Sequence, residues 1–93
     1  MEKQKTYRII LSGRVQGVGF RYFTEDQANV NNIKGYVKNT INNKVEVVCQ
    51  GNDSDIEMFI REIKKGPAFA SVADFQMEPL TGEAQFEVFE IRY

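Results

Sequence analysis

Alternating apolar and polar residues mark the first element of the chain. In YRIILS, residues 7–12, Tyr7, Ile9 and Leu11 fall on one face and Ile10 on the other, which predicts a β-strand. After a glycine-rich run, the residues from Tyr22 to about Asn31 predict a helix, because apolar side chains recur on one side of it. Those side chains are Phe20, Phe23 and Val30.

Two further strands follow, separated by a short turn. They are predicted over Lys34–Ile41 and Val45–Gln50, and the second places Val45, Val47 and Cys49 on one face. The pair Asn42-Asn43 lies between the strands, and asparagine tolerates the positive φ that a tight turn requires. The spacing therefore predicts a hairpin.

The stretch from Asp53 to Gly66 carries the clearest helical pattern. Ser54 and Glu57 predict a capping box at its start, and Gly66 before Pro67 predicts its end. Apolar residues recur at helical spacing and predict the buried stripe. These are Ile56, Phe59, Ile60 and Ile63.

The chain closes with two more predicted strands, Ala73–Glu78 and Phe86–Arg92, joined around Thr81-Gly82. The alternation slips near Val88-Phe89, so the register of the last strand stays open. The element order is β-α-β-β-α-β plus a C-terminal strand, which is the split β-α-β order of ferredoxin-like domains. We therefore predict an α+β fold in a single domain over residues 1–93, with an antiparallel sheet and two helices on one face.

This topology predicts which loops lie together. A helix joins the first and second strands, so the two run parallel and end at the same edge of the sheet. The glycine run follows the first strand, and Lys38-Asn39-Thr40 lies toward the matching end of the second. If the third strand lies between them, the two segments are ~10 Å apart, at about 4.8 Å for each strand spacing.

The composition narrows the classes of function. The chain has 93 residues, a formal net charge of −1, no histidine and one cysteine. The absence of histidine excludes Ser-His and Cys-His nucleophilic sites and zinc sites built on imidazole. The lone Cys49 cannot form an internal disulfide, which favours a reducing cytoplasm. The mildly acidic balance argues against a nucleic-acid partner, and no apolar run approaches membrane length.

The glycine-rich run itself is SGRVQGVGFRYF, residues 12–23, with three glycines and two arginines. The Walker and GxGxxG phosphate patterns both fail in it. What remains is a loop that enters a helix, where backbone N–H groups and Arg21 can bind an anion. The alternative is a glycine-rich connector with two solvated arginines, and we expect Arg14 to serve structure or general electrostatics. These residues alone do not decide between the two.

Several segments together resemble one known family. GRVQGVGFR resembles the acylphosphatase motif, and GYVKN with VEVVCQG resembles that family's second block. GPAFASV and FEIRY are similar to its later stretches, so the resemblance covers nearly the whole chain. It implies hydrolysis of small acyl phosphates, with Arg21 binding the phosphoryl group and Asn39 positioning the attacking water. The implied phosphate cradle is made of the backbone amides of Val15, Gln16, Gly17, Val18, Gly19 and Phe20.

The implied chemistry needs no cofactor and no metal. A carboxylate leaving group, whose conjugate acid has a pKa of about 4, departs at neutral pH without a general acid, which suits a chain without histidine. Asn39 can aim a water at phosphorus, although an amide is too weak a base to deprotonate it early. Inorganic phosphate is then expected as product and inhibitor, the acyl group to be broadly tolerated, and the protein to be a monomer.

Other interpretations stay open. Lys34-Gly35-Tyr36-Val37 is similar to part of an aromatic RNA-binding motif, but the pattern breaks at Val37. A regulatory domain that senses a phosphorylated metabolite would share the anion site without turnover. An acylphosphatase-like domain of a carbamoyl-transferring enzyme is disfavoured, because this chain has no room for the other domains.

Overall fold

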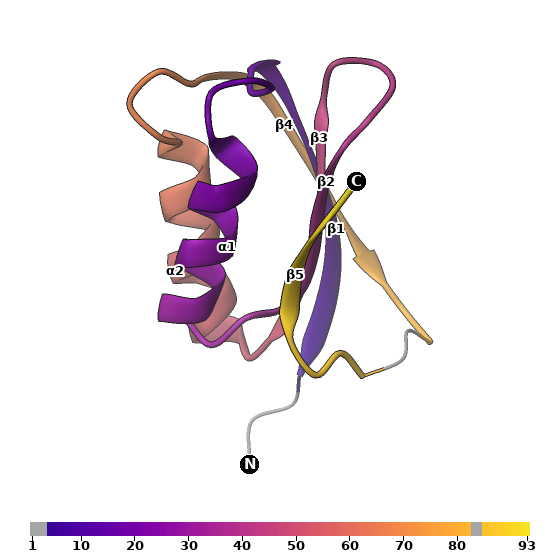
Figure 1. Ribbon diagram of the computed structural model, residues 1–93. Helices are drawn as coiled ribbons and strands as arrows, with labels where there is room; N and C mark the ends of the chain where they lie inside the picture. Colours follow the sequence, from indigo (N-terminus) through magenta and orange to yellow (C-terminus); the bar gives the residue numbers. More distant parts are fainter. Residues whose placement is uncertain (1–3, 83–84) are drawn as a thin grey trace.

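Strands and helices follow one another in the predicted order in the computed structural model, which describes residues 4–82 and 85–93. Within them the elements are β1 (Lys5–Arg14), α1 (Phe20–Val30), β2 (Lys34–Asn39), β3 (Val45–Gly51), α2 (Asp53–Lys65), β4 (Ser71–Leu80) and β5 (Phe89–Arg92). The strands form one sheet in the order β4-β1-β3-β2-β5 (Figure 1). The predicted ferredoxin-like α+β fold is confirmed, with β3 between β1 and β2.

The pairing of the last strand differs from the prediction of an antiparallel sheet. The pairs β1–β3, β1–β4 and β2–β3 are antiparallel, but β5 pairs with β2 in parallel, with Gly35 opposite Phe89. The strands β4 and β5 therefore lie at opposite edges of the sheet. The predicted strand over Phe86–Arg92 was too long, because Val88 is 62% exposed and β5 begins only at Phe89.

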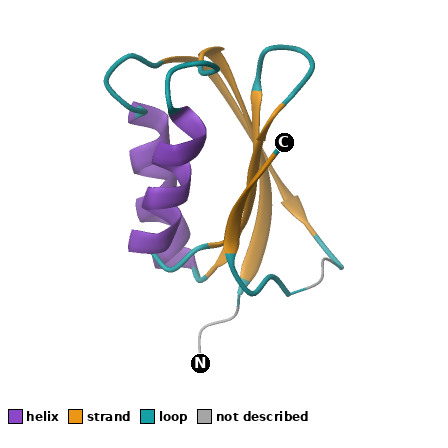
Figure 2. Ribbon diagram, in the orientation of Figure 1, coloured by secondary structure: helices purple, strands orange, loops and turns teal. Residues whose placement is uncertain are grey.

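Both helices cover the same face of the sheet, and the core lies between the two layers (Figure 2). The predicted apolar face of β3 is buried there, as are Ile9 and Leu11 of β1 and Ile56, Phe59 and Ile63 of α2. Tyr7 and Ile60, which were predicted on the same faces, are partly buried against this core. The buried apolar residues are Ile9, Leu11, Val15, Phe20, Ala28, Ile33, Val37, Val45, Val47, Cys49, Ile56, Phe59, Ile63 and Phe89. No helix within the described ranges is both long and apolar enough to cross a membrane.

The predicted buried face of α1 was right at Phe20 but wrong at Val30. The helix starts at Phe20 rather than Tyr22. Its buried residues are spaced four positions apart and are Phe20, Thr24 and Ala28. Val30 is 78% exposed. Thr24 is tolerated in the core because its hydroxyl donates a hydrogen bond to the Phe20 carbonyl oxygen at 2.8 Å.

The predicted capping box of α2 was also wrong. Asn52 is the N-cap, and its side-chain oxygen accepts a hydrogen bond from the Asp55 N–H at 2.8 Å. Ser54 lies inside the first turn, where its hydroxyl donates to the same Asn52 oxygen at 3.2 Å. The predicted end is confirmed, since Gly66 caps the helix with a φ of 70°.

The hairpin between β2 and β3 is shorter on its first side than predicted. β2 ends at Asn39, and Ile41 is fully exposed in the turn. Asn43 has the positive φ expected of the turn, at 62°. This hairpin, the loop after β1 and the loop before β4 lie at the same end of the molecule (Figure 1).

Candidate functional site

The loop between β1 and α1 is shaped by glycines with left-handed backbone conformations. Gly17 and Gly19 have φ values of 72° and 76°, a region that residues with a Cβ rarely adopt. Gly19 is also the N-cap of α1, and it offers no side chain to cap the helix. The first turn of α1 contains no acidic residue, so the positive end of the helix dipole is left free for an external anion.

The backbone N–H groups of this loop also indicate an anion site. The N–H groups of residues 16–22 donate no hydrogen bond to any backbone or side-chain acceptor in the described residues. The first hydrogen bond of the helix is donated by Phe23 to the Gly19 oxygen at 3.0 Å. A series of unpaired N–H groups leading into a helix is an anion-binding arrangement.

Arg21 lies in the first turn of α1, and its guanidinium group forms no hydrogen bond or ion pair with any residue in the described part of the chain. Its one close partner there is the ring of Tyr93, whose centroid lies 4.8 Å from the Arg21 Cζ atom. A cation held over an aromatic face keeps all its N–H donors available.

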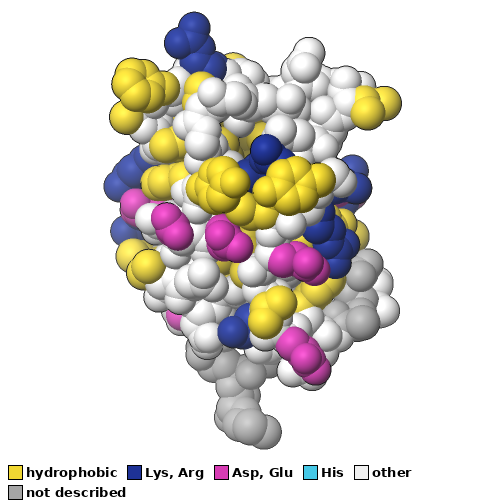
Figure 3. Space-filling view, in the orientation of Figure 1, with side chains coloured by type: hydrophobic (Ala, Val, Ile, Leu, Met, Phe, Trp, Pro, Cys, Tyr) yellow, Lys and Arg dark blue, Asp and Glu magenta, His cyan; other side chains and the backbone are white. Residues whose placement is uncertain are grey.

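The Tyr93 hydroxyl in turn interacts with the hydroxyl of Tyr22. That hydrogen bond is the main cause that raises the pKa of Tyr93 above its ordinary value, against the opposing effect of Arg21. Tyr22, Arg21 and Tyr93 thus form one exposed group. Figure 3 shows hydrophobic and basic side chains gathered on the face over α1 and the C-terminal end of β5.

Asn39 is the last residue of β2 and lies on the helix-covered face, in register with Val45 of β3. Among the buried side-chain nitrogen and oxygen atoms of the described residues, its Oδ1 atom is the one that has no hydrogen-bond partner. Burying an amide oxygen unpaired is costly, so native structures seldom retain one without a ligand, water or catalytic role.

A cavity of about 230 Å³ brings these groups together. It is lined by residues of the loop, of the first turn of α1 and of the end of β2. The residues are Val15, Gly17, Gly19, Phe20, Arg21, Tyr22 and Asn39. The glycine loop and Asn39 therefore lie close together at the same end of the sheet, as predicted.

Two residues of the predicted cradle do not line this cavity. Val18 is partly buried against the core. Gln16 turns its side chain toward the β2–β3 hairpin, where Nε2 donates to the Thr40 oxygen at 3.0 Å and to the Lys44 oxygen at 2.7 Å. Arg14 ends β1, is exposed and lies outside the cavity.

Sequence reasoning missed the side chains of Gln16, Tyr22 and Tyr93. A long polar residue inside a glycine loop and a tyrosine directly after Arg21 were visible signals for the first two. Nothing local indicated Tyr93, because it reaches Arg21 only through the pairing of β5 with β2.

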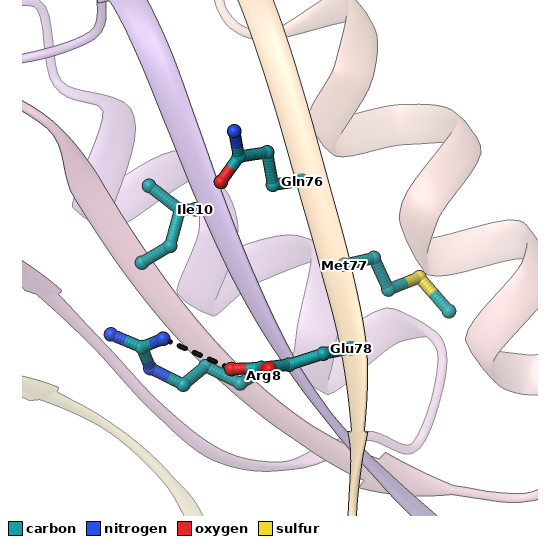
Figure 4. Close-up of a pocket in the computed structure, with 5 residues that line it drawn as sticks. All are labelled: Arg8, Ile10, Gln76, Met77 and Glu78. Atoms are coloured by element: carbon teal, nitrogen blue, oxygen red, sulfur yellow. Dashed lines mark hydrogen bonds and ion pairs between the residues drawn. The ribbon is translucent and has the colours of Figure 1, made fainter.

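A second and larger cavity, of about 370 Å³, lies on the face of the sheet away from the helices and is lined by Arg8, Ile10, Gln76, Met77 and Glu78. Its charged groups are already paired. Arg8 donates to Glu78 at 3.1 Å and to Glu46 at 2.6 Å, and these bonds raise the pKa of Arg8. Figure 4 shows the Arg8–Glu78 bond, with Met77 pointing to the other side of β4. With its cation satisfied, this cavity is a poor anion site.

The described residues contain no cluster of three or more histidine, cysteine, aspartate or glutamate side chains that could hold a metal ion. The donors at the loop cavity are N–H groups and amides, which suit an anion rather than a cation.

Known proteins resemble this chain in sequence and in fold. The acylphosphatase family profile matches residues 7–91. An acylphosphatase of Bacillus pumilus (strain SAFR-032) is 41% identical over 86 residues, which are 92% of this chain and 96% of that protein. One from Actinobacillus pleuropneumoniae is 45% identical over 83 residues, covering 89% and 92% of the two chains. The crystal structure of acylphosphatase from Bacillus subtilis superposes with a TM-score of 0.92 at 36% identity, covering 96% of this chain and 99% of that one.

Proposed function

Since this chain belongs to the acylphosphatase family of hydrolases, we propose that it cleaves the carboxyl–phosphate bond of small acyl phosphates by direct attack of a water. The observation that carries the mechanism is the loop cavity. Unpaired backbone N–H groups, a free guanidinium and an unpaired buried amide oxygen lie around one space there. Each group supplies a separate requirement of phosphoryl transfer.

The phosphoryl group is held by Arg21 and by the N–H groups of the loop and of the first helical turn. Arginine matches phosphate oxygens in bidentate geometry, and the helix N-terminus adds a favourable dipole. Because phosphoryl transfer spreads charge over the three non-bridging oxygens, donors that surround them stabilise the transition state. Gln16 and Val18 contribute through their backbone N–H groups only.

The attacking water is held by the Oδ1 atom of Asn39, which accepts a hydrogen bond from it. The water oxygen forms a bond to phosphorus as the bond from phosphorus to the acyl oxygen breaks. The bonding pair leaves with the carboxylate, which needs no general acid because its conjugate acid has a pKa of about 4. The water proton passes to a phosphoryl oxygen, so the products are a carboxylate and inorganic phosphate.

Further properties follow from the same proposal. Inorganic phosphate occupies the cradle and inhibits competitively. The protein is a monomer, consistent with exposed apolar residues that are scattered: Val30 lies on α1, Met58 on α2 and Val88 in the loop before β5. It binds no nucleic acid, because Arg8 on the open face of the sheet is paired with carboxylates. The single cysteine favours a cytoplasmic location.

The test is hydrolysis of benzoyl phosphate, followed by ultraviolet absorbance, in the unmodified protein and in Arg21→Ala. We expect turnover to fall and the inhibition constant of phosphate to rise about tenfold or more, the cost of a lost charge-assisted hydrogen bond. Arg14→Ala is the matched control, since Arg14 is an exposed cation at the other end of the same loop and outside the cavity. Unchanged phosphate inhibition in a folded Arg21→Ala protein would remove Arg21 from the site.

Asn39 separates chemistry from binding. Asn39→Ala should lower turnover about a hundredfold or more, because the nucleophile loses its position, while phosphate inhibition stays nearly unchanged. Asn39→Asp adds a charge beside an anion and should do no better than alanine if Asn39 is a neutral water clamp. Near-normal turnover in a folded Asn39→Ala protein, or higher turnover in Asn39→Asp, would contradict this role. Asn29→Ala, an exposed position on α1, serves as the control.

A further inference from the structure

Two exposed tyrosines lie next to Arg21, one lining the loop cavity and the other stacked on the guanidinium, and neither belongs to the buried core. Tyr22 is 61% exposed and lines the cavity beside Arg21 and Asn39. Tyr93 is 92% exposed, and its ring faces the Arg21 guanidinium at 4.8 Å. Large aromatic side chains left in water beside a binding cavity are typical of ligand contacts.

We propose that Tyr22 and Tyr93 form an acyl-group subsite that favours aromatic acyl phosphates over small aliphatic ones such as acetyl phosphate. This inference rests on the proposed function, because it needs the phosphoryl group to lie in the cradle of loop amides and Arg21. It goes beyond that function by assigning a preference to the part of the substrate that is not phosphate.

The order of groups along the substrate matches the order of groups at the cavity. In an aroyl phosphate only the ester oxygen and the carbonyl carbon separate the ring from phosphorus. With the phosphoryl group held at Arg21, the ring is within reach of Tyr22, because both residues line the same cavity. The methyl group of acetyl phosphate is too short to cover an aromatic ring there.

Arg21 connects the two tyrosines, because it directly precedes Tyr22 in α1 and its guanidinium lies over the Tyr93 ring. An aromatic ring is the acyl group that can pack against exposed tyrosine rings. Because both tyrosines remain open to solvent, the effect is a preference and other acyl groups are still accepted.

The experiment compares kcat/KM for benzoyl phosphate and acetyl phosphate in the unmodified protein and in Tyr22 variants. Taking the ratio between substrates cancels changes that affect the phosphoryl site alone. In Tyr22→Ala we expect the benzoyl-to-acetyl ratio to fall about two- to tenfold, the size of one lost aromatic contact. Tyr22→Phe should keep most of the ratio, and Tyr22→Leu, which keeps apolar bulk without a ring, should not.

Val30→Ala is the matched control, because Val30 is an exposed apolar residue at the other end of the same helix. Phosphate inhibition should be unchanged in every Tyr22 variant. An unaltered ratio in folded Tyr22→Ala, or equal falls for both substrates with weakened phosphate inhibition, would overturn the subsite. A benzoyl-to-acetyl ratio in Tyr22→Leu as high as in the unmodified protein would show that the subsite needs apolar bulk rather than an aromatic ring. Failure of the unmodified protein to hydrolyse either substrate would instead refute the proposed function.

Discussion

Replacing Gln16 with alanine should separate the glycine loop from the hairpin that carries Asn39. The Gln16 side chain is the direct connection between them, because its Nε2 atom donates to the Thr40 and Lys44 oxygens at 3.0 and 2.7 Å. Both carbonyls follow β2 in the chain, so these bonds hold the phosphate loop against the end of the strand that positions Asn39.

The magnitude follows from what each carbonyl retains. A hydrogen bond contributes a net ~0.5–1.5 kcal/mol, so two lost bonds set a range of about 1–3 kcal/mol. The Lys44 oxygen still accepts the Thr40 N–H at 2.9 Å and is not left unpaired. We therefore expect the free energy of unfolding to fall by about 1–2 kcal/mol, in the lower part of that range.

Urea unfolding followed by circular dichroism measures the stability, and benzoyl phosphate turnover with phosphate inhibition measures the site. Turnover should fall by more than phosphate affinity, because Asn39 shifts relative to a cradle whose own N–H groups remain. Gln16→Glu should be worse than alanine, since a carboxylate would face two carbonyl oxygens. Gln27→Ala is the control, because its side chain forms no hydrogen bond with any described residue.

A Gln16→Ala protein with unchanged urea midpoint and turnover would refute this reasoning. It would mean that the loop holds its position through its backbone alone. A loss of phosphate affinity as large as the loss of turnover would also contradict it, by showing that Gln16 shapes the cradle rather than its distance from Asn39.

Three further predictions address the core, a helix end and the chemistry. Burial raises the pKa of Cys49 to about 12, so iodoacetamide at pH 8 should label this cysteine only when the protein is unfolded in urea. Mass spectrometry measures the labelling, and rapid labelling of the folded protein would contradict the prediction. The same shift means that stability should fall as the pH rises from about 9 toward 12, because the unfolded thiol ionises first. Asn52→Ala should lower the free energy of unfolding, measured in urea, by about 1 kcal/mol, and Ser54→Ala should lower it by less. A larger loss in Ser54→Ala would indicate that Ser54 is the capping residue. Exhaustive chelation should leave benzoyl phosphate turnover unchanged, and a loss restored by magnesium or zinc would show that a metal takes part.

Much of the fold is determined by residues that are close together in the sequence. The alternation in Tyr7–Ser12 and Val45–Gln50 and the stripe of Ile56, Phe59 and Ile63 each report a buried face directly, because the period of side chains is a local property of strand and helix. The order of these elements then permits few topologies, which is why the position of β3 between β1 and β2 was predictable.

The chemistry of the loop was readable for a related reason. Closely spaced glycines before a helix leave N–H groups unpaired whatever the rest of the fold does, and Arg21 lies at that junction. The parallel course of β1 and β2 then brings Asn39 to the same end of the sheet. Only the resemblance to the acylphosphatase family, however, gave Arg21 and Asn39 their predicted roles, because each residue alone fits an ordinary structural position.

The tertiary structure alone decided the features that depend on residues distant in the chain. The place of β5 beside β2 depends on which sheet edge is still free, and no local period in residues 86–92 reports it. The start of α1 at Phe20 depends on a ring that fits the core, and the burial of the Asn39 oxygen depends on the elements packed around it. Gln16 and Tyr93 acquired partners 24 or more residues away, on other elements. Pairings of this kind are set by which surfaces meet on folding, and that is information a local pattern does not carry.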